Sequence, residues 1–365
     1  MICSRFDVHA ESREYPVYIG QNLIVEINEI LKGSFDRAFV ISDDIITPFY
    51  LDSLVEKLNT SGIEVIPKIL QAGESSKTLD SVNDLYAFLS ENLATRSDAI
   101  IALGGGVIGD IAGFVASTFK RGMMLIQVPT TLLAQVDSSI GGKTGVNLSE
   151  GKNLVGTFYQ PHAVIVDVCT LNSLPTIDFL AGLAEVVKYG VTMDPELFQI
   201  LVENRNEIIL RNPAVLTIVV ERALRNKAQI IKLDEREEKG KREILNFGHT
   251  IGHAIETCSN HTILHGQAVA IGMVEEAKLA VRKGLLEDSV LESLISILEL
   301  YGLPTEIPDN LDIKQLSGVM KQDKKVRSGQ LKIPVLVGLG KTEIMIVDLI
   351  DNLSSKMNVG ENIQC

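Results

Sequence analysis

The sequence predicts an α/β domain with a mostly parallel sheet, followed by an all-α domain. In the first half of the chain, short apolar runs alternate with amphipathic stretches, which is the pattern of strands and helices in a parallel sheet. From Ile177 onward the stretches indicate one helix after another. We place the boundary near Leu174-Pro175, so the expected domains are residues 1–174 and 175–365.

The individual elements follow from apolar runs for strands and from helical spacing of apolar residues for helices. The expected strands are Tyr15–Ile19, Ala38–Ser42, Ile63–Leu70, Asp98–Leu103, Met124–Val128 and Val164–Val168. The helices expected between them are Asn22–Leu31, Phe49–Asn59, Leu79–Asn92 and Ile108–Phe119. In the second domain the expected helices are Ile177–Met193, Pro195–Leu210, Ala214–Leu233, Ile244–Cys258, Ala268–Lys283, Asp288–Leu300 and Ile313–Met320, followed by a strand pair, Leu331–Val337 and Glu343–Ile346. The polar, glycine-rich segment from Thr130 to Asn153 is expected to be a long functional loop.

A glycine-rich turn follows the fourth expected strand and precedes a helix. Glycine lets backbone N–H groups approach a phosphate closely, and a helix N-terminus adds partial positive charge. Gly104, Gly106 and Gly109 fit the pattern G-x-G-x-x-G. However, no acid stands about 20 residues later, where the ordinary dinucleotide fingerprint has one. The residues alone leave open a nucleotide site of unusual layout and a tight turn without a ligand. A membrane span over residues 99–119 is excluded by five glycines and Asp110.

Composition and charge limit the class of protein. The chain has 365 residues, of which 45% are hydrophobic and 22% charged, so we expect a globular protein. A formal net charge of −13 argues against a general nucleic-acid binder but is compatible with a local basic pocket for a small anion. The four cysteines lack C-x-x-C spacing, and the N-terminal segment lacks an apolar signal core. We therefore expect reduced thiols, no membrane segment and a cytoplasmic location.

Histidines gather in the second domain, where four of the six fall between residues 249 and 265. His249 and His253 are spaced to share one face of a helix, which makes them a candidate pair of metal ligands. Thr250 stands where the H-E-x-x-H motif of zinc proteases has its glutamate, so that motif is absent. Glu185 lies on an otherwise apolar helix, where a carboxylate is costly unless it is paired or metal-bound. The alternative is that these histidines are ordinary core or surface groups.

Basic residues accompany the glycine-rich segments. Lys143 and Lys152 lie beside Gly141-Gly142 and Gly151, where side chains are sparse and backbone amides exposed. That setting suits the recognition of phosphate, although a solvated side chain is the alternative for each residue. The basic residues that we single out are Arg121, Lys143, Lys152, Lys188, Lys227, Arg242, Lys324 and Lys325.

Seven segments, taken in order, resemble the motifs of the 3-dehydroquinate synthase family within the sugar phosphate cyclase superfamily. The segments are Gly104–Asp110, Gln127–Thr144, Gly151–Asn153, Gly182–Gly190, Asn246–Glu256, His265–Gly266 and Asp323–Lys325. The resemblance covers nearly the whole chain. It implies an N-terminal nucleotide-binding α/β domain, a C-terminal helical domain, and a site between them.

The resemblance also assigns residues to cofactors. NAD would lie over the glycine turn and meet Asp43 instead of a later acid, and the implied NAD-binding residues are Asp43, Glu74, Lys77, Gly105, Gly106, Val107, Ile108, Gly109, Asp110, Thr130, Thr131, Lys143, Lys152, Thr170, Leu171, Asn172 and Ser173. A divalent metal, zinc or cobalt, would be held by Glu185, His249 and His265. This set replaces the His249–His253 pair that helical spacing suggests, and His253 would face the substrate.

The implied reaction converts 3-deoxy-D-arabino-heptulosonate 7-phosphate to 3-dehydroquinate and phosphate. It would run through transient oxidation by NAD, phosphate elimination, reduction, ring opening and an intramolecular aldol addition. The implied substrate and catalytic residues are Arg121, Asp137, Lys143, Asn153, Lys188, Lys227, Arg242, Asn246, His253 and one of Lys324 and Lys325. Arg121 would reach the phosphate, in its own or a neighbouring subunit of a homodimer. The alternatives are a sibling cyclase, a metal-dependent polyol dehydrogenase and a non-enzymatic binding module.

Overall fold

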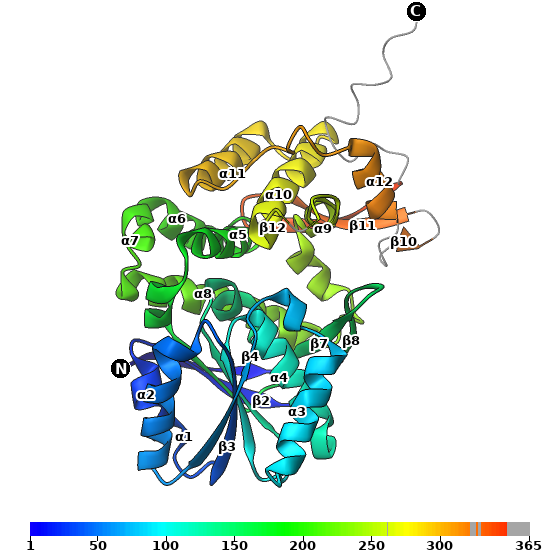
Figure 1. Ribbon diagram of the computed structural model, residues 1–365. Coiled ribbons are helices and arrows are strands. Elements are labelled where there is room, and N and C mark those ends of the chain that lie inside the picture. Colours follow the sequence, from blue (N-terminus) through cyan, green and yellow to red (C-terminus); the bar gives the residue numbers. More distant parts are fainter. Residues whose placement is uncertain (261, 322–325, 328–329, 349–365) are drawn as a thin grey trace, which may run out of the picture. The chain divides into compact units, whose positions relative to one another are not determined.

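The computed structural model describes residues 1–260, 262–321, 326–327 and 330–348 (Figure 1). The chain forms two compact units, of which the first comprises residues 1–175 and 211–236. The second unit comprises residues 176–210 and the chain from 237 onward. The first break falls one residue from the boundary that the sequence predicts. The return of residues 211–236 to the first unit departs from that prediction.

The first unit is built on a seven-stranded sheet with the order β1-β2-β9-β6-β5-β3-β4. Only β1 runs antiparallel to its neighbour, so the sheet is mostly parallel, as predicted. β1 was missed because it is an edge strand that buries few side chains, among them Phe6 and Val8. The strands are β1 (Ile2–His9), β2 (Glu14–Gly20), β3 (Arg37–Asp43), β4 (Glu64–Leu70), β5 (Ala99–Gly104), β6 (Met124–Pro129) and β9 (Ala163–Asp167).

Helices cover both faces of this sheet (Figure 1). Side chains alternate between the faces along a strand, so in β5 Ile101 joins one core while Ile100 and Ala102 join the other. Both faces are apolar, which explains the nearly continuous apolar runs in the sequence. The helices on the first face are η1 (Leu23–Glu26), α1 (Ile27–Leu31) and α2 (Thr47–Thr60), and those on the second are α3 (Leu79–Glu91) and α4 (Gly106–Thr118).

Helix α8 (Pro213–Leu233) belongs to the first unit although it follows the helices of the second in sequence. Its buried face packs against β1, β2 and the short helix η4 (Ala134–Ser138). The helix begins where Asn212 accepts a hydrogen bond from the Ala214 N–H and Pro213 occupies the first turn. Helical spacing in a sequence cannot say which core a helix covers, so the predicted assignment to residues 175–365 was wrong for this segment.

The segment that was expected to be a long loop is partly regular. It contains η4 and a hairpin of β7 (Lys143–Leu148) and β8 (Gly151–Phe158). The two strands can approach closely because Gly145 has no side chain. An added Cβ there would lie 2.5 Å from the Val155 carbonyl oxygen. Glycines that suggest a loop in the sequence therefore permit a tightly packed hairpin.

The second unit is mostly helical and ends in a small antiparallel sheet. The expected strand pair is present as β11 and β12, so the unit is not entirely helical. Among the described helices none is long and apolar enough to cross a membrane. The elements are α5 (Thr176–Thr192), α6 (Pro195–Glu203), α7 (Arg205–Ile209), η6 (Lys241–Asn246), α9 (His249–Cys258), α10 (His265–Arg282), α11 (Asp288–Leu300), α12 (Ile313–Lys321), β10 (Val326–Arg327), β11 (Gln330–Gly338) and β12 (Lys341–Asp348).

One histidine outside the predicted sites makes the stability of the first unit depend on pH. Burial, helped by the positive charge of Arg13, lowers the pKa of His162 from 6.5 to about 4. Its Nδ1 accepts a hydrogen bond of 3.2 Å from the Leu125 N–H, which requires the neutral ring. The unfolded chain would take up this proton at a higher pH than the folded chain. The contribution of His162 is therefore complete above pH 6.5 and is lost as the pH falls toward about 4.

We predict that His162→Asn reduces the loss of stability in that pH range, because the Asn amide oxygen can accept the same bond without titrating. Urea unfolding of the wild type and the variant, followed from about pH 8 to about pH 4.5, measures the difference. The free energy of unfolding should fall less steeply in the variant below pH 6.5. Parallel curves for the two proteins would contradict this assignment.

Candidate functional site

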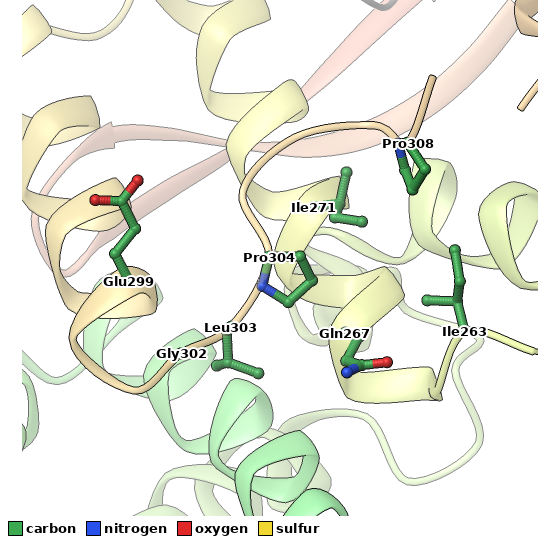
Figure 2. Close-up of a pocket in the computed structure, with 8 residues that line it drawn as sticks. All are labelled: Ile263, Gln267, Ile271, Glu299, Gly302, Leu303, Pro304 and Pro308. Atoms are coloured by element: carbon green, nitrogen blue, oxygen red, sulfur yellow. The ribbon is translucent and has the colours of Figure 1, made fainter. Parts of the chain in front are cut away.

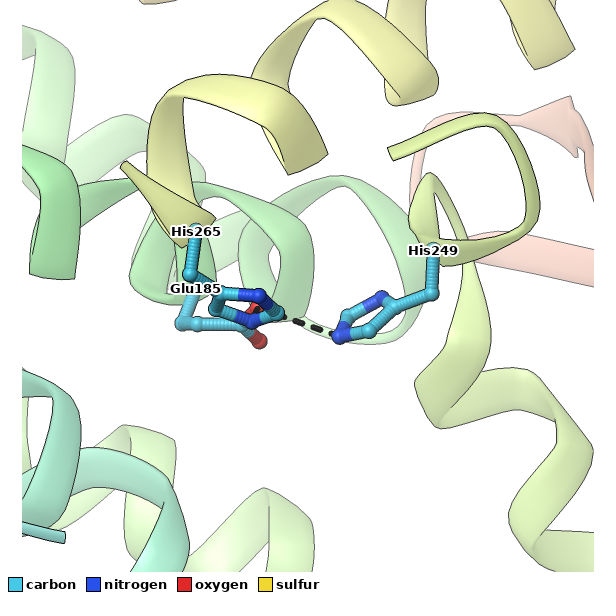
Figure 3. A group of neighbouring side chains, drawn as sticks. All are labelled: Glu185, His249 and His265. Atoms are coloured by element: carbon cyan, nitrogen blue, oxygen red, sulfur yellow. Dashed lines mark ion pairs between the residues drawn. The ribbon is translucent and has the colours of Figure 1, made fainter. Parts of the chain in front are cut away.

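Three helices of the second unit bring Glu185, His249 and His265 together (Figure 3). Glu185 comes from the middle of α5, and the histidines are the first residues of α9 and α10. The Glu185 Oε1 atom lies 3.4 Å from His249 Nε2 and 3.5 Å from His265 Nε2. One ligand atom from each residue falls within 4.8 Å of the others, so the group can hold a metal ion.

Glu185 is buried because the helix that carries it is apolar and packed into the core. The side chain is 1% exposed, and its neighbours Ala184 and Val186 are fully buried. A buried carboxylate must be compensated by positive charge or hydrogen bonds. Lys188, one turn later, forms an ion pair with Glu185 Oε2 and donates a 2.7 Å hydrogen bond to the Leu245 carbonyl. The ammonium group is thereby fixed beside the carboxylate.

The histidines are presented by a close approach of α9 and α10. Gly248 precedes His249 with a φ of 81°, and its N–H donates a 2.7 Å hydrogen bond to Glu276 Oε2. A side chain at Gly272 on α10 would overlap the Gly248 carbonyl oxygen. The missing Cβ atoms let the two helices pack backbone against backbone, which sets the start of α9.

The two imidazoles differ in their electrostatic surroundings. Burial and the Lys188 charge lower the pKa of His249, against the opposing effect of Glu185. Burial alone would also lower the pKa of His265, but its contacts with Glu185 and Glu256 raise it to about 10. Glu256 was not among the predicted site residues, although it ends the motif Asn246–Glu256.

His253 lies beside the cluster, not within it. Its ring centroid is 5.3 Å from that of His249 and 6.0 Å from that of His265. The side chain is exposed, and it forms a second possible metal group with Glu256 and His265. The helical spacing of His249 and His253 therefore brings the rings together without giving them a shared carboxylate from α5.

In the first unit the glycine-rich turn forms the start of α4, with Gly105 as the residue before the first turn. A Cβ at Gly105 would lie 3.0 Å from Thr131, and one at Gly109 would lie 2.9 Å from Gln127 Oε1. Larger residues would crowd these neighbours. The turn therefore keeps a bare backbone at a helix N-terminus, next to the predicted residue Thr131.

Lys77 joins this turn to the hairpin. The residue is 5% exposed. Its ammonium group donates hydrogen bonds of 2.5 Å to Asp110 Oδ2 and 2.6 Å to Asn153 Oδ1. Burial raises the pKa of Asp110, and Lys77 opposes that rise. Glu74 accepts a 2.7 Å hydrogen bond from Asn147 on the same hairpin. Predicted residues that are far apart in sequence thus meet through side-chain contacts.

Asp137 and Lys227 form a second predicted pair within the first unit. The Lys227 ammonium lies 2.9 Å from Asp137 Oδ1 and donates a 2.7 Å hydrogen bond to the Asp137 carbonyl. Lys227 is 5% exposed and comes from α8, which packs against the helix η4 that carries Asp137. The inclusion of α8 in this unit is what brings the pair together.

A buried glutamine that the sequence analysis did not single out ties the same segments together. The Gln135 amide donates to the Asp167 carbonyl and to Thr170 Oγ1, each at 2.9 Å. It links η4 to the helix η5 (Val168–Ser173), which contains the predicted segment from Thr170 to Ser173. Its position as a polar residue between Leu132-Leu133-Ala134 and Val136 was the available signal.

The remaining predicted residues are spread over both units. Asp43 is buried at the end of β3 and accepts hydrogen bonds from the N–H groups of Ile45 and Ile46. Arg242 is buried in the second unit, with Nε 3.4 Å from Glu237 Oε1. The exposed residues among them are Arg121, Lys143, Lys152, Asn153 and Asn172. Asn246 ends η6, Thr130 follows β6, and Lys324 and Lys325 lie outside the described residues.

A separate cavity of about 510 Å³ lies in the second unit between the start of α10 and the end of α11 (Figure 2). Most of its lining is apolar, with Gln267 and Glu299 as the polar groups. None of the predicted site residues lines it. The lining residues are Ile263, Gln267, Ile271, Glu299, Gly302, Leu303, Pro304 and Pro308.

Comparison with solved structures places the fold among sugar phosphate cyclases. A 2-deoxy-scyllo-inosose synthase complexed with carbaglucose-6-phosphate, NAD+ and Co2+ has a TM-score of 0.87 and 29% identity, covering 95% of this chain and 97% of that one. A 2-epi-5-epi-valiolone synthase from Streptomyces hygroscopicus subsp. jinggangensis, with NAD+ and Zn2+ bound, has a TM-score of 0.84 and 27% identity over 92% of each chain. An iron-containing alcohol dehydrogenase at 16% identity, with a TM-score of 0.64 and coverage of 84% and 90%, shares the fold alone.

The sequence comparisons are more specific. The models of the N-terminal and C-terminal parts of 3-dehydroquinate synthase match residues 68–181 and 182–326. The 3-dehydroquinate synthase of Caldanaerobacter subterraneus subsp. tengcongensis is 43% identical, covering 93% of this chain and 96% of the relative. That of Halorhodospira halophila is 46% identical, with coverage of 91% and 93%. The chain belongs to the 3-dehydroquinate synthase family.

The close approach of α9 and α10 leads to a prediction about stability. In Gly272→Ala the new methyl group would overlap the Gly248 carbonyl and lie 2.9 Å from the Gly252 nitrogen. Overpacking of this kind costs typically about 1–3 kcal/mol, and backbone neighbours leave little room to relax. We expect the free energy of unfolding in urea to fall by about 2 kcal/mol or more.

Gly318→Ala on α12 is the matched control, because no atom of the described part of the chain lies within 4 Å of its added Cβ. Alanine in a helix interior is expected to leave stability unchanged or raise it by up to about 1 kcal/mol. Equal stability of the two variants would contradict the packing described for α9 and α10.

Proposed function

We propose that this chain is a 3-dehydroquinate synthase, which converts 3-deoxy-D-arabino-heptulosonate 7-phosphate to 3-dehydroquinate and phosphate. The observation that carries the proposal is the cluster of Glu185, His249 and His265 at metal-ligand spacing, in a chain of this family. The identity of 43% and 46% to proteins of that name exceeds the 27–29% identity to the sibling cyclases. A sibling activity is therefore the second candidate.

The cluster fits a divalent zinc or cobalt ion. Four ligands at about 2.1 Å in a tetrahedral arrangement stand about 3.4 Å apart. The Glu185 oxygen lies 3.4 and 3.5 Å from the two imidazole nitrogens. A bound divalent metal would lower the pKa of a substrate hydroxyl and stabilise the alkoxide. Lys188 would hold Glu185 in place and add positive charge beside the reacting oxygen.

The glycine turn and its neighbours fit NAD. The backbone from Gly105 to Asp110 would hold the pyrophosphate at the start of α4. Asp43, Glu74 and Lys77 would meet the adenosine end, and Thr130, Thr131, Lys143, Lys152 and residues Thr170–Ser173 would complete the pocket. Bound there, NAD+ would supply reversible hydride transfer, which leaves no net oxidation.

The remaining polar residues would hold the substrate. Lys227, fixed by Asp137, and the buried guanidinium of Arg242 supply positive charge for a carboxylate or a transient oxyanion. Arg121 and Lys152 would bind the phosphate, and Asn153, Asn246 and one of Lys324 and Lys325 would contact hydroxyls or the carboxylate. His253 is exposed beside the metal cluster, where an imidazole can relay a proton.

We also propose a homodimer located in the cytoplasm. The described cysteines Cys3, Cys169 and Cys258 are free, which suits a reducing compartment. Two-fold assembly rests on the family resemblance, and sedimentation of the purified chain measures it directly.

The function predicts phosphate release without accumulation of reduced nicotinamide. Purified protein loaded with cobalt and NAD+ should release one phosphate per heptulosonate phosphate consumed, because the hydride taken from the substrate returns to it. Phosphate assays and absorbance of reduced nicotinamide follow the two quantities in one reaction. Glucose 6-phosphate tests the sibling activity, and glycerol tests a polyol dehydrogenase.

Steady growth of reduced nicotinamide with glycerol, without phosphate release, would support a dehydrogenase and contradict the proposal. Phosphate release from glucose 6-phosphate alone would favour a sibling cyclase. No turnover with any of the three compounds would contradict the proposal.

A further inference from the structure

Glu256 contacts the side of His265 that faces away from Glu185. The His265 Nδ1 atom lies 3.1 Å from Glu256 Oε2, whereas Nε2 lies 3.5 Å from Glu185 Oε1. The Glu256 side chain is 13% exposed and comes from the last turn of α9, while His265 begins α10. One imidazole thus joins two carboxylates from two different helices.

Two interpretations of this contact are chemically distinct. His253, Glu256 and His265 could hold a second metal ion, since their ligand atoms lie within 4.8 Å of one another. Alternatively, Glu256 accepts a hydrogen bond from the His265 Nδ1–H. A neutral imidazole has one N–H donor and one nitrogen with a lone pair, so it can donate to one carboxylate while its other nitrogen binds a metal. Binding two metals would require the loss of both ring protons.

The geometry favours the hydrogen bond. A separation of 3.1 Å is within the usual range for N–H···O contacts. His249 has the same arrangement, with Nδ1 3.2 Å from the Phe247 carbonyl and Nε2 toward Glu185. Each histidine therefore has an acceptor at Nδ1 and the shared carboxylate near Nε2. A second metal held by His253, Glu256 and His265 would be less buried than one held by Glu185, His249 and His265, because His253 is exposed.

We propose that Glu256 is a positioning residue for the metal site, which accepts the Nδ1–H of His265 and so directs Nε2 toward the metal position. The inference rests on the proposed function, because it assumes that Glu185, His249 and His265 bind a divalent ion. Outer carboxylates of this kind fix the tautomer and ring orientation and raise the basicity of the ligand nitrogen. Glu256 also links α9 to α10 at the point where both present a histidine.

Charge supports the same role. Two carboxylates and two neutral imidazoles balance a divalent cation, whereas Glu185 alone leaves one positive charge uncompensated beside the buried ammonium group of Lys188. Removal of Glu256 therefore weakens the site through lost orientation and lost charge. Glu256 does not itself approach the metal position, because the His265 ring stands between it and Glu185.

The test measures cobalt(II) affinity of the metal-stripped full-length chain, without substrate or NAD+, by competition with a chelator. Glu256→Ala should bind cobalt about 10–100-fold more weakly than the wild type, as is typical for lost outer-shell partners. Glu256→Gln should lose less, because its amide oxygen can still accept the Nδ1–H. Glu275→Gln, a buried carboxylate on α10 whose partner is Lys278, is the matched control and should bind cobalt as the wild type does.

Elemental analysis after equilibrium dialysis against excess cobalt gives the stoichiometry, and circular dichroism checks that each variant is folded. The proposal is supported if the wild type binds one cobalt per chain, Glu256→Gln binds it more weakly than the wild type, and Glu256→Ala binds it more weakly still. If Glu256→Ala does not fold, Glu256→Gln decides by comparison with Glu275→Gln. If the folded Glu256 variants bind cobalt as tightly as Glu275→Gln does, the positioning role of Glu256 is overturned.

Two cobalt ions per wild-type chain, of which Glu256→Ala loses only the weaker, would overturn the proposal in favour of a second metal site. A wild type that binds no cobalt would overturn both this inference and the metal dependence in the proposed function. Normal wild-type binding with an unaffected Glu256→Ala removes only the inference, so the two failures are distinguishable.

Discussion

The buried carboxylate of Glu185 is the constraint on which the second unit depends. Removing such a charge from water costs several kcal/mol, and the cost is offset only by close positive groups and hydrogen-bond donors. The chain supplies Lys188 on the same helix and the imidazoles of His249 and His265 from two others. The packing of α5, α9 and α10 is therefore inseparable from the geometry of the candidate metal site.

In both units, glycines at the candidate sites let neighbouring segments approach the backbone closely. Gly248 and Gly272 let α9 and α10 meet, which sets the first turn of α9 and its histidine. In the first unit, Gly105 and Gly109 clear the start of α4, while Lys77 ties Asp110 to the hairpin. Each site combines a bare backbone with a few buried, paired charges, and this combination is typical of binding sites that are formed before the ligand arrives.

Much of the fold could be predicted because both faces of the parallel sheet are apolar, so strands such as β5 are continuous apolar runs. β1 was missed because an edge strand buries few side chains. The hairpin of β7 and β8 was missed because its glycines resemble those of a loop. The unit to which α8 belongs was not predictable, since its apolar stripe does not identify the core it covers.

The candidate site was less accessible to local reasoning. Helical spacing pairs His249 with His253, whereas the cluster draws one residue from each of three helices, which no single-element pattern can show. The apolar helix around it had marked Glu185 as a carboxylate that must be paired or metal-bound, and family resemblance added His265 and joined both to His249. Gln135 and Glu256 were missed by both routes, because their importance lies in contacts with other elements: Asp167 and Thr170 for Gln135, and His265 at the start of the next helix for Glu256.

We propose that Glu185, His249 and His265 bind the metal and that His253 does not. The most direct measurement is the metal content of His265→Ala and His253→Ala after loading with cobalt(II) and dialysis. His265→Ala leaves two of the three ligands and should retain little metal, whereas His253→Ala should retain about one ion per chain, as a three-ligand site does. The reverse result, a metal-poor His253→Ala and a metal-replete His265→Ala, would contradict the account and restore the pair on α9.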